Sequence, residues 1–195
     1  MNLMSPQLIR NGSALSGLVM VLFVIAHLAG LIPAFLAPAS FEAYASALHR
    51  SSFLPVVEIA LAATAVVHVG LTLSKTIANR SSGNHSRLSS RRQAPLAAMA
   101  SRSKLAAGLV TLVFLVIHLQ QLRWPRPADG GERAALQAVL DHPSSLLLYA
   151  AAAVALGLHL LHGAEAAHRS LGWLTPANGM ILRQSGRLIA AVIGG

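Results

Sequence analysis

The sequence contains no cysteine. This absence excludes disulfide bonds and thiolate metal sites within the chain. It also excludes iron–sulfur clusters held by this chain and haem attached covalently through cysteine. Any metal or cofactor bound by the chain must therefore use other side chains as ligands.

Charged side chains are also scarce. They make up 11% of the residues, against roughly 25% in an ordinary soluble domain, whereas apolar residues make up 54%. A helix that crosses a membrane needs about 20 apolar residues. Four stretches meet this requirement: residues 14–36, 53–74, 105–122 and 144–164. We therefore predict an all-α integral membrane helical bundle with four transmembrane helices.

A fifth apolar segment, at about 178–195, is interrupted by Arg183 and Arg187. We expect it to be helical but short for a full crossing. The first apolar run follows Arg10 as in a signal peptide, but it is long for the apolar region of one. We interpret it as a retained helix and residues 1–195 as a single membrane domain.

Acidic side chains are absent from residues 75–104, which hold seven of the fifteen basic residues. The positive-inside rule places this connection, and with it the N-terminus, in the cytoplasm. We predict a multi-pass protein of the bacterial inner membrane with a cytoplasmic N-terminus. The net charge of +9 would suggest nucleic acid as the partner of a soluble protein. The short, serine-rich connection is a poor candidate for such a module, and we expect no nucleic acid to bind.

One apolar phrase occurs twice. Residues 17–28 read GLVMVLFVIAHL, and residues 108–119 read GLVTLVFLVIHL. Alignment of the two phrases superposes His27 on His118, with an offset of 91 positions. The phrase therefore indicates an internal duplication.

The same offset relates the other two predicted spans, because His68 and His159 are also 91 positions apart. We predict two repeats of a helical hairpin, at about 10–80 and 101–171. Each repeat crosses the membrane an even number of times, so both have the same orientation. Such repeats are related by an axis along the membrane normal.

The four histidines are expected at two depths. His27 and His118 lie roughly 20 Å beyond the cytoplasmic start of their helices, in the outer half of the membrane. His68 and His159 lie a similar distance along helices that run inwards, which places them in the inner half. The twofold axis can bring the two imidazoles of each pair towards each other.

Several interpretations of these histidines stay open. An intramembrane histidine can simply bond a backbone group or hydroxyl, but an ionisable group in lipid is a functional candidate by default. A proton relay would suit added carboxylates, which the centres of these helices lack. Zinc usually takes four close ligands. Two facing imidazoles per level instead suit a flat porphyrin held in the core of a bundle.

Two glycines lie on the helix faces of these histidines. Gly30 follows His27 by three positions, and Gly163 follows His159 by four. They could make room for a large planar ligand. Close packing of the helices is the alternative explanation.

The chain resembles the di-haem cytochrome b membrane anchor of succinate:quinone oxidoreductases and fumarate reductases, in its single-chain, five-helix form. The resemblance rests on the repeated phrase ending in histidine and leucine, and on HLLHG followed by LGWLTP. The most specific part is His159, with Gly163 four positions and Gly172 thirteen positions later.

The resemblance implies four haem ligands. His27 and His118 would hold the iron of the distal haem b, and His68 and His159 that of the proximal haem b. This pairing agrees with the one that the depths predict.

The resemblance also implies partners and a role. A flavoprotein subunit and an iron–sulfur subunit would dock on the cytoplasmic side, and electrons would pass through the two haems to or from a quinone, expected to be menaquinone. The chain would act in succinate dehydrogenase of the tricarboxylic acid cycle, without performing the dicarboxylate chemistry. Glu42 is a candidate contact for the quinone, or else a solvated surface residue.

Two other functions are alternatives. The chain could anchor a different membrane oxidoreductase, such as a nitrate reductase or a hydrogenase, which also use cytochrome b subunits. It could also be a transporter or an intramembrane metal-binding protein without haem. The spectrum and the copurifying subunits would discriminate among them.

The remaining polar residues allow less specific predictions. Ser16, His162 and Arg169 are candidates for contact with haem propionates or with the iron–sulfur subunit, or for plain interfacial anchoring. The side chains of three other histidines are expected in solvent, within connections: His49, His85 and His142. Trp124 and Trp173 are expected at the membrane interface.

Overall fold

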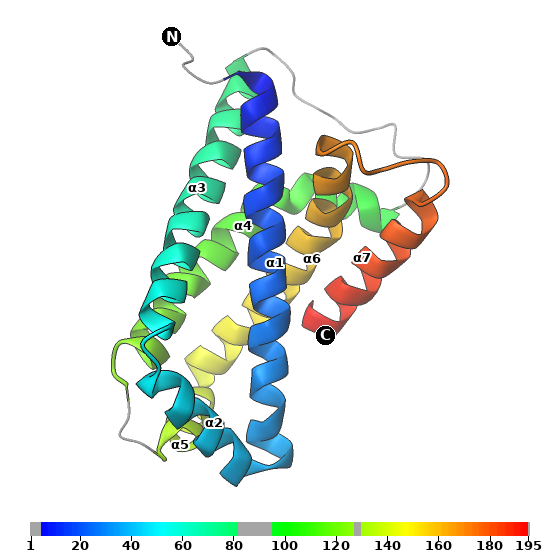
Figure 1. Cartoon of the computed structure of the whole chain (residues 1–195). Helices are drawn as coiled ribbons and strands as arrows, with labels where there is room; N and C mark the ends of the chain where they lie inside the picture. Colours follow the sequence, from blue (N-terminus) through cyan, green and yellow to red (C-terminus); the bar gives the residue numbers. More distant parts are fainter. Residues whose placement is uncertain (1–4, 82–94, 127–129, 195) are drawn as a thin grey trace.

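The computed structural model describes residues 5–81, 95–126 and 130–194, and this part of the chain is helical without strands (Figure 1). The elements in order are α1 (Pro6–Leu36), α2 (Pro38–Arg50), α3 (Leu54–Ser81), α4 (Pro95–His118), the π-helix η1 (Leu119–Arg123), α5 (Glu132–Leu140), α6 (Pro143–Ser170) and α7 (Gly179–Gly194).

Four segments of the described chain are long and apolar enough to cross a membrane: Pro6–Leu36, Leu54–Ser81, Ala97–Arg123 and Pro143–Ser170. Large apolar side chains project from them, including Phe35 and Val66, each 73% exposed. A membrane explains both features, because lipid solvates such side chains and a helix satisfies its own backbone. The predicted all-α membrane bundle is confirmed.

Prolines mark the starts of several helices. Pro6, Pro38 and Pro143 each occupy the first turn of their helix. Proline suits this position because its missing N–H would have no partner there. At the start of α1 the Ser5 hydroxyl also accepts a hydrogen bond from the backbone N–H of Leu8, at 3.2 Å.

The order long helix, short helix, long helix occurs twice, first as α1–α2–α3 and then as α4–α5–α6, with η1 extending α4. Within each half the two long helices pack against each other, and α1 also packs against α6. Figure 1 shows α2 and α5 together at one end of the bundle, which we call the α2–α5 end. The opposite end, where α1 begins, is called the N-terminal end.

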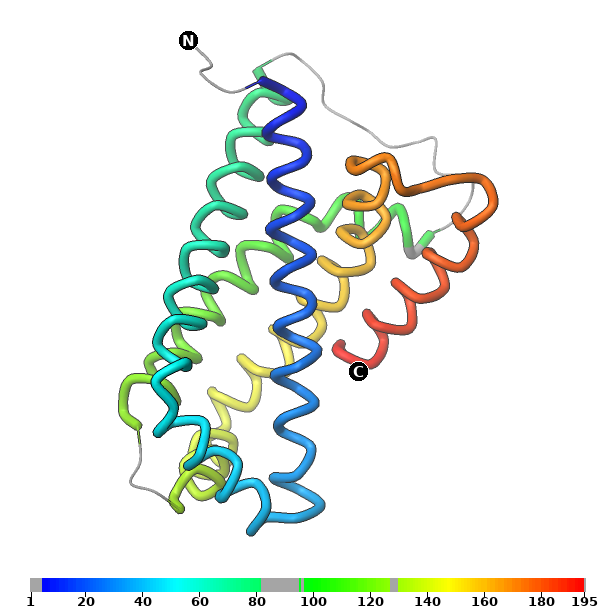
Figure 2. Tube along the Cα trace, viewed as in Figure 1, coloured from blue at the N-terminus to red at the C-terminus, as the bar shows by residue number. Residues whose placement is uncertain are grey.

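The last helix, α7, packs along α6 and stops part of the way down the bundle (Figures 1 and 2). Its 16 residues span about 24 Å. It is not among the helices long and apolar enough to cross, as its two arginines led us to expect. Small residues allow the close contact: a Cβ on Gly157 would lie 2.9 Å from the carbonyl oxygen of Ala190.

Polar contacts join the two halves at the α2–α5 end. The carboxylate of Glu42 accepts hydrogen bonds from the backbone N–H groups of Glu132 and Arg133, at 3.1 Å and 2.8 Å. These donors belong to the first turn of α5 and have no partner within their own helix. The Arg133 side chain in turn donates to the carbonyl oxygen of Ala34, at 3.0 Å. Glu42 is therefore a cap supplied by one half to the other.

The prediction that His49 lies in solvent is wrong. Its Nδ1 lies 2.7 Å from a carboxylate oxygen of Glu132, and the two side chains are only 21% and 13% exposed. The partner lies on α5, far along the sequence, so a local sequence pattern could not predict this contact. His142 is exposed as predicted, and His85 lies outside the described residues.

Candidate functional site

The four membrane histidines form two pairs. His27 on α1 lies beside His118 at the end of α4, with ring centroids 6.0 Å apart and ring planes at 82°. His68 on α3 lies beside His159 on α6, with centroids 6.3 Å apart and planes at 77°. Each pair therefore joins one residue of each half of the chain.

The histidines of a pair reach across between helices that do not pack closely. The closely packed pairs among the described long helices are α1 with α3, α4 with α6, and α1 with α6. Neither α1 with α4 nor α3 with α6 is among them. Each pair of imidazoles therefore lies between two helices that do not pack closely against each other.

Two glycines show how far apart the two histidine pairs lie along the helices. A Cβ on Gly17 would lie 3.1 Å from Cε1 of His68, and a Cβ on Gly108 would lie 3.3 Å from Cε1 of His159. Each glycine opens the repeated phrase, and the histidine of the other pair follows ten positions later along the same helix. The two levels are therefore separated by about 15 Å along the helix axis.

The ring of His68 is fixed through its Nδ1 atom. This atom lies 3.1 Å from the carbonyl oxygen of Ser13 and 3.2 Å from the hydroxyl of Ser16, which also donates to the Gly12 carbonyl. A carbonyl oxygen only accepts, so Nδ1 carries the hydrogen in the neutral ring. The Nε2 atom then keeps its lone pair available for a metal. Ser16, a predicted propionate or interface residue, thus contacts the imidazole itself.

The ring of His159 has the equivalent place in the second half. It faces the backbone of Lys104, which stands 91 positions after Ser13. Its buried Nδ1 makes no hydrogen bond of normal geometry to the described residues. Ala107 replaces Ser16 at the matching position, so the hydroxyl contact is missing.

Aromatic rings support the other pair. Phe23 stacks on His27 and Phe114 stacks on His118, with centroid distances of 5.5 Å and 5.4 Å. The hydroxyl of Tyr149 on α6 lies 3.0 Å from Nδ1 of His118. The two phenylalanines lie four positions before their histidines, so helical spacing could have identified this contact. Nothing in the sequence points to Tyr149.

The separation within each pair suits an iron with two axial imidazoles. Two metal–nitrogen bonds of about 2.0 Å and two ring radii of about 1.1 Å put the centroids roughly 6.2 Å apart. The two pairs agree with this requirement. Residues 5–81, 95–126 and 130–194 contain no group of three or more metal-ligating side chains, which a typical zinc site would need. The residues therefore fit two b-type haems better than zinc.

The other predicted site residues differ in where they lie relative to the two histidine pairs. His162 is half-buried, three positions after His159 on α6. Arg169 forms an ion pair with Glu165, one turn earlier on the same helix. Glu42 caps α5, and its contact with quinone stays a prediction.

The surroundings of Gly30 and Gly163 differ from each other, although we expected space for a planar ligand beside both. A Cβ on Gly30 would lie 3.2 Å from the hydroxyl of Tyr44, so the Tyr44 ring occupies the place that we expected a planar ligand to use. A Cβ on Gly163 would meet nothing within 4 Å. The glycines that lie against histidine rings are instead Gly17 and Gly108.

An ion pair that we did not predict from the sequence lies near the α2–α5 end. Arg123 of η1 donates from its Nε and Nη2 atoms to the two carboxylate oxygens of Glu58 on α3, at 2.5 Å each. Glu58 is the only acidic residue in the predicted span 53–74, and this rarity was the available signal. The pair links the two halves of the chain.

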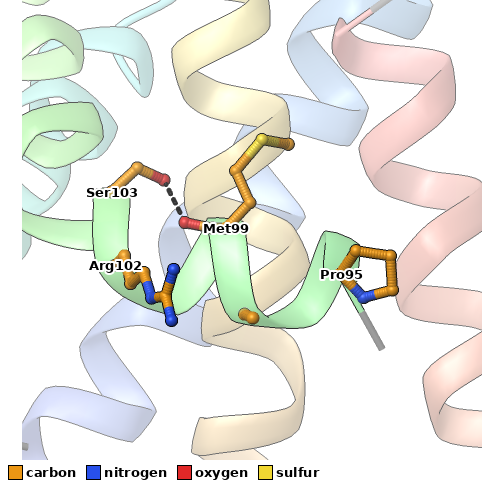
Figure 3. A pocket seen from close by; sticks show the side chains of 5 residues that line it. Pro95, Met99, Arg102 and Ser103 are labelled. Carbon is orange, nitrogen blue, oxygen red and sulfur yellow. Dashed lines mark hydrogen bonds between the residues drawn. The ribbon is translucent and has the colours of Figure 1, made fainter. Parts of the chain in front are cut away.

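A pocket lies on the first turns of α4 (Figure 3). Its lining residues are Pro95, Ala98, Met99, Arg102 and Ser103. The Ser103 hydroxyl donates to the carbonyl oxygen of Met99 on the same helix, at 2.9 Å. The pocket draws on a single helix and contains none of the four histidines, so we assign no ligand to it.

Comparison of the chain with protein-family models, with curated proteins and with solved structures gives no match.

Proposed function

We propose that this chain is a di-haem cytochrome b that anchors a succinate:quinone oxidoreductase or fumarate reductase in the membrane. It carries electrons between the iron–sulfur subunit and a membrane quinone. The observation that carries the proposal is the separation within the two histidine pairs, 6.0 Å and 6.3 Å between centroids. Each separation suits bis-imidazole ligation of one iron.

The residues of each pair have equivalent roles. His27 and His118 hold the distal haem, and His68 and His159 hold the proximal haem. Each haem, when bound, supplies a centre that gains and loses one electron. The Ser13 carbonyl and the Ser16 hydroxyl keep the Nδ1 side of His68 occupied, which leaves Nε2 as the ligating atom.

The distribution of charge supports an orientation. More of the described basic residues lie towards the N-terminal end (Arg10, Lys75, Arg80, Arg102, Lys104 and Arg169) than at or near the α2–α5 end (Arg50, Arg123, Arg126 and Arg133). By the positive-inside rule this end faces the cytoplasm, in the inner membrane of a bacterium. The flavoprotein and iron–sulfur subunits dock at this end, nearer to the pair His68 and His159. The quinone, with menaquinone as the expected species, binds from the membrane.

The experiment is haem analysis of the chain purified in detergent, alone and with its copurifying subunits. We expect b-type bands in the reduced-minus-oxidised spectrum and two haems per chain. His27→Ala and His118→Ala should each remove the same haem, whereas His68→Ala and His159→Ala should each remove the other. Every single variant should therefore retain about half of the haem.

Exposed His142 supplies the matched control, because His142→Ala should retain both haems. A wild-type chain without haem would end the proposal, and variants that lose haem across the two pairs would refute the pairing. Copurification with a nitrate reductase or a hydrogenase, in place of a flavoprotein and an iron–sulfur protein, would assign the anchor to another oxidoreductase.

A further inference from the structure

The Tyr149 side chain makes a polar contact with one proposed haem ligand. Its hydroxyl lies 3.0 Å from Nδ1 of His118. Its ring lies edge-on to Phe114, at 4.9 Å between centroids, and Phe114 in turn stacks on His118. Tyr149 is half-buried on α6, within a segment long and apolar enough to span the membrane. The three rings therefore form one packed cluster on the α6 side of His118.

The first half of the chain lacks this arrangement. The position equivalent to Tyr149 is Glu58, 91 residues earlier. The Glu58 carboxylate accepts two hydrogen bonds from Arg123. Besides facing His118, the ring of His27 stacks on Phe23. Tyr149 thus distinguishes His118 from its repeat-related partner.

We infer that Tyr149 is a positioning residue of the distal haem site, whose hydroxyl accepts a hydrogen bond from Nδ1–H of His118. The inference rests on the proposed function. With the hydrogen held on Nδ1, Nε2 is the atom that binds iron. A hydrogen bond from the far side of a ligating imidazole fixes the ring and makes it a stronger donor to the metal. Stronger donation stabilises the oxidised iron and lowers the reduction potential of that haem.

The test is Tyr149→Phe in the complete complex, or in the full-length chain where no subunit copurifies. The substitution removes one hydroxyl and keeps the ring against Phe114. We expect the affinity for the distal haem to fall between about 10-fold and 100-fold, the range typical of such outer contacts. In an optical redox titration the potential of one haem should rise and that of the other should stay unchanged. The His68→Ala variant, which retains only the distal haem, identifies the wave that moves.

The other tyrosine of the chain provides the control. The Tyr44 hydroxyl lies beside Gly30 and has no hydrogen bond to the four histidines within the described residues, so Tyr44→Phe should leave both potentials unchanged. Unchanged potentials and haem retention in Tyr149→Phe would overturn the inference while leaving the proposed function in place. Equal loss of both haems would also overturn it, because Tyr149 would then be a general packing residue. A wild-type chain without haem would overturn both.

Discussion

Single residues decide how the imidazoles are held in an apolar bundle. An ionisable side chain at this depth is costly unless its polar atoms have partners. The Nδ1 atom of His68 has the Ser13 carbonyl and the Ser16 hydroxyl, and that of His118 has the Tyr149 hydroxyl. In each pair at least one imidazole is therefore fixed by a hydrogen bond from outside the pair.

Gly17 is a residue whose substitution should act directly on a proposed haem ligand. A valine there would place its Cβ 3.1 Å from the His68 ring, and overpacking of this kind costs about 1–3 kcal/mol. In Gly17→Val we expect His68 to be displaced, the proximal haem to be lost and the distal haem to be retained. Haem content and the redox titration of the purified variant measure this.

Gly70 on α3 is the matched control. A Cβ on this glycine would meet nothing within 4 Å, although Gly70 is only two positions from His68. Gly70→Val should therefore keep both haems. If Gly17→Val also kept both, the close approach to His68 would have no part in cofactor binding.

At the level of elements, the π-helix η1 begins directly after His118. Its wider turn is seen in the hydrogen bond from the Trp124 N–H to the Leu119 carbonyl, at 2.9 Å. Within η1, Gln121 donates to Ser145 on α6, while Arg123 pairs with Glu58 on α3. One short element therefore contacts a long helix of each half. Single-turn π-helices are frequent at functional sites.

The short helices α2 and α5 suggest a second prediction, for the Glu42 cap. Glu42→Ala leaves two N–H groups at the start of α5 without their acceptor, and loss of a cap costs about 1 kcal/mol. We expect a lower melting temperature by circular dichroism in detergent, with quinol oxidation unchanged. Asp141→Ala, at an exposed carboxylate near the same end, should leave the melting temperature unchanged.

The opposite result in the Glu42→Ala variant would give Glu42 a different role. A variant with normal stability but without quinol oxidation would favour the quinone contact that the sequence led us to consider. The hydrogen bonds to α5 would then be incidental to the role of Glu42.

On the scale of the whole molecule, two helical hairpins meet mainly through α1 and α6. The histidine pairs lie between the helices that pack less closely, one pair towards each end of the bundle. With the two haems bound as proposed, electrons would pass along the bundle axis, with a step of about 15 Å between the two levels.

The proposed orientation can be tested because the chain has no cysteine of its own. We introduce Ser81→Cys at the N-terminal end or His142→Cys at the α2–α5 end, both at exposed positions. A maleimide that cannot cross the membrane should label the His142→Cys variant in spheroplasts. It should label the Ser81→Cys variant only after the membrane is permeabilised. Labelling in the reverse order would invert the orientation.

The sequence alone determined the four long apolar helices, the limited reach of α7 and the duplication. Hydropathy and helical periodicity are properties of neighbouring residues, and they survive in any packing of the helices. The offset of 91 positions also selected the histidine partners that the structure places together. A repeat carries this information because equivalent residues have equivalent depths.

The tertiary structure decided the surroundings of each imidazole. Ser16 at His68, Tyr149 at His118 and the contact between His49 and Glu132 all join different helices. These contacts depend on how far each helix is rotated about its axis and on which neighbour it packs against. Side-chain packing between distant segments sets both, and neither hydropathy nor spacing along one helix records it.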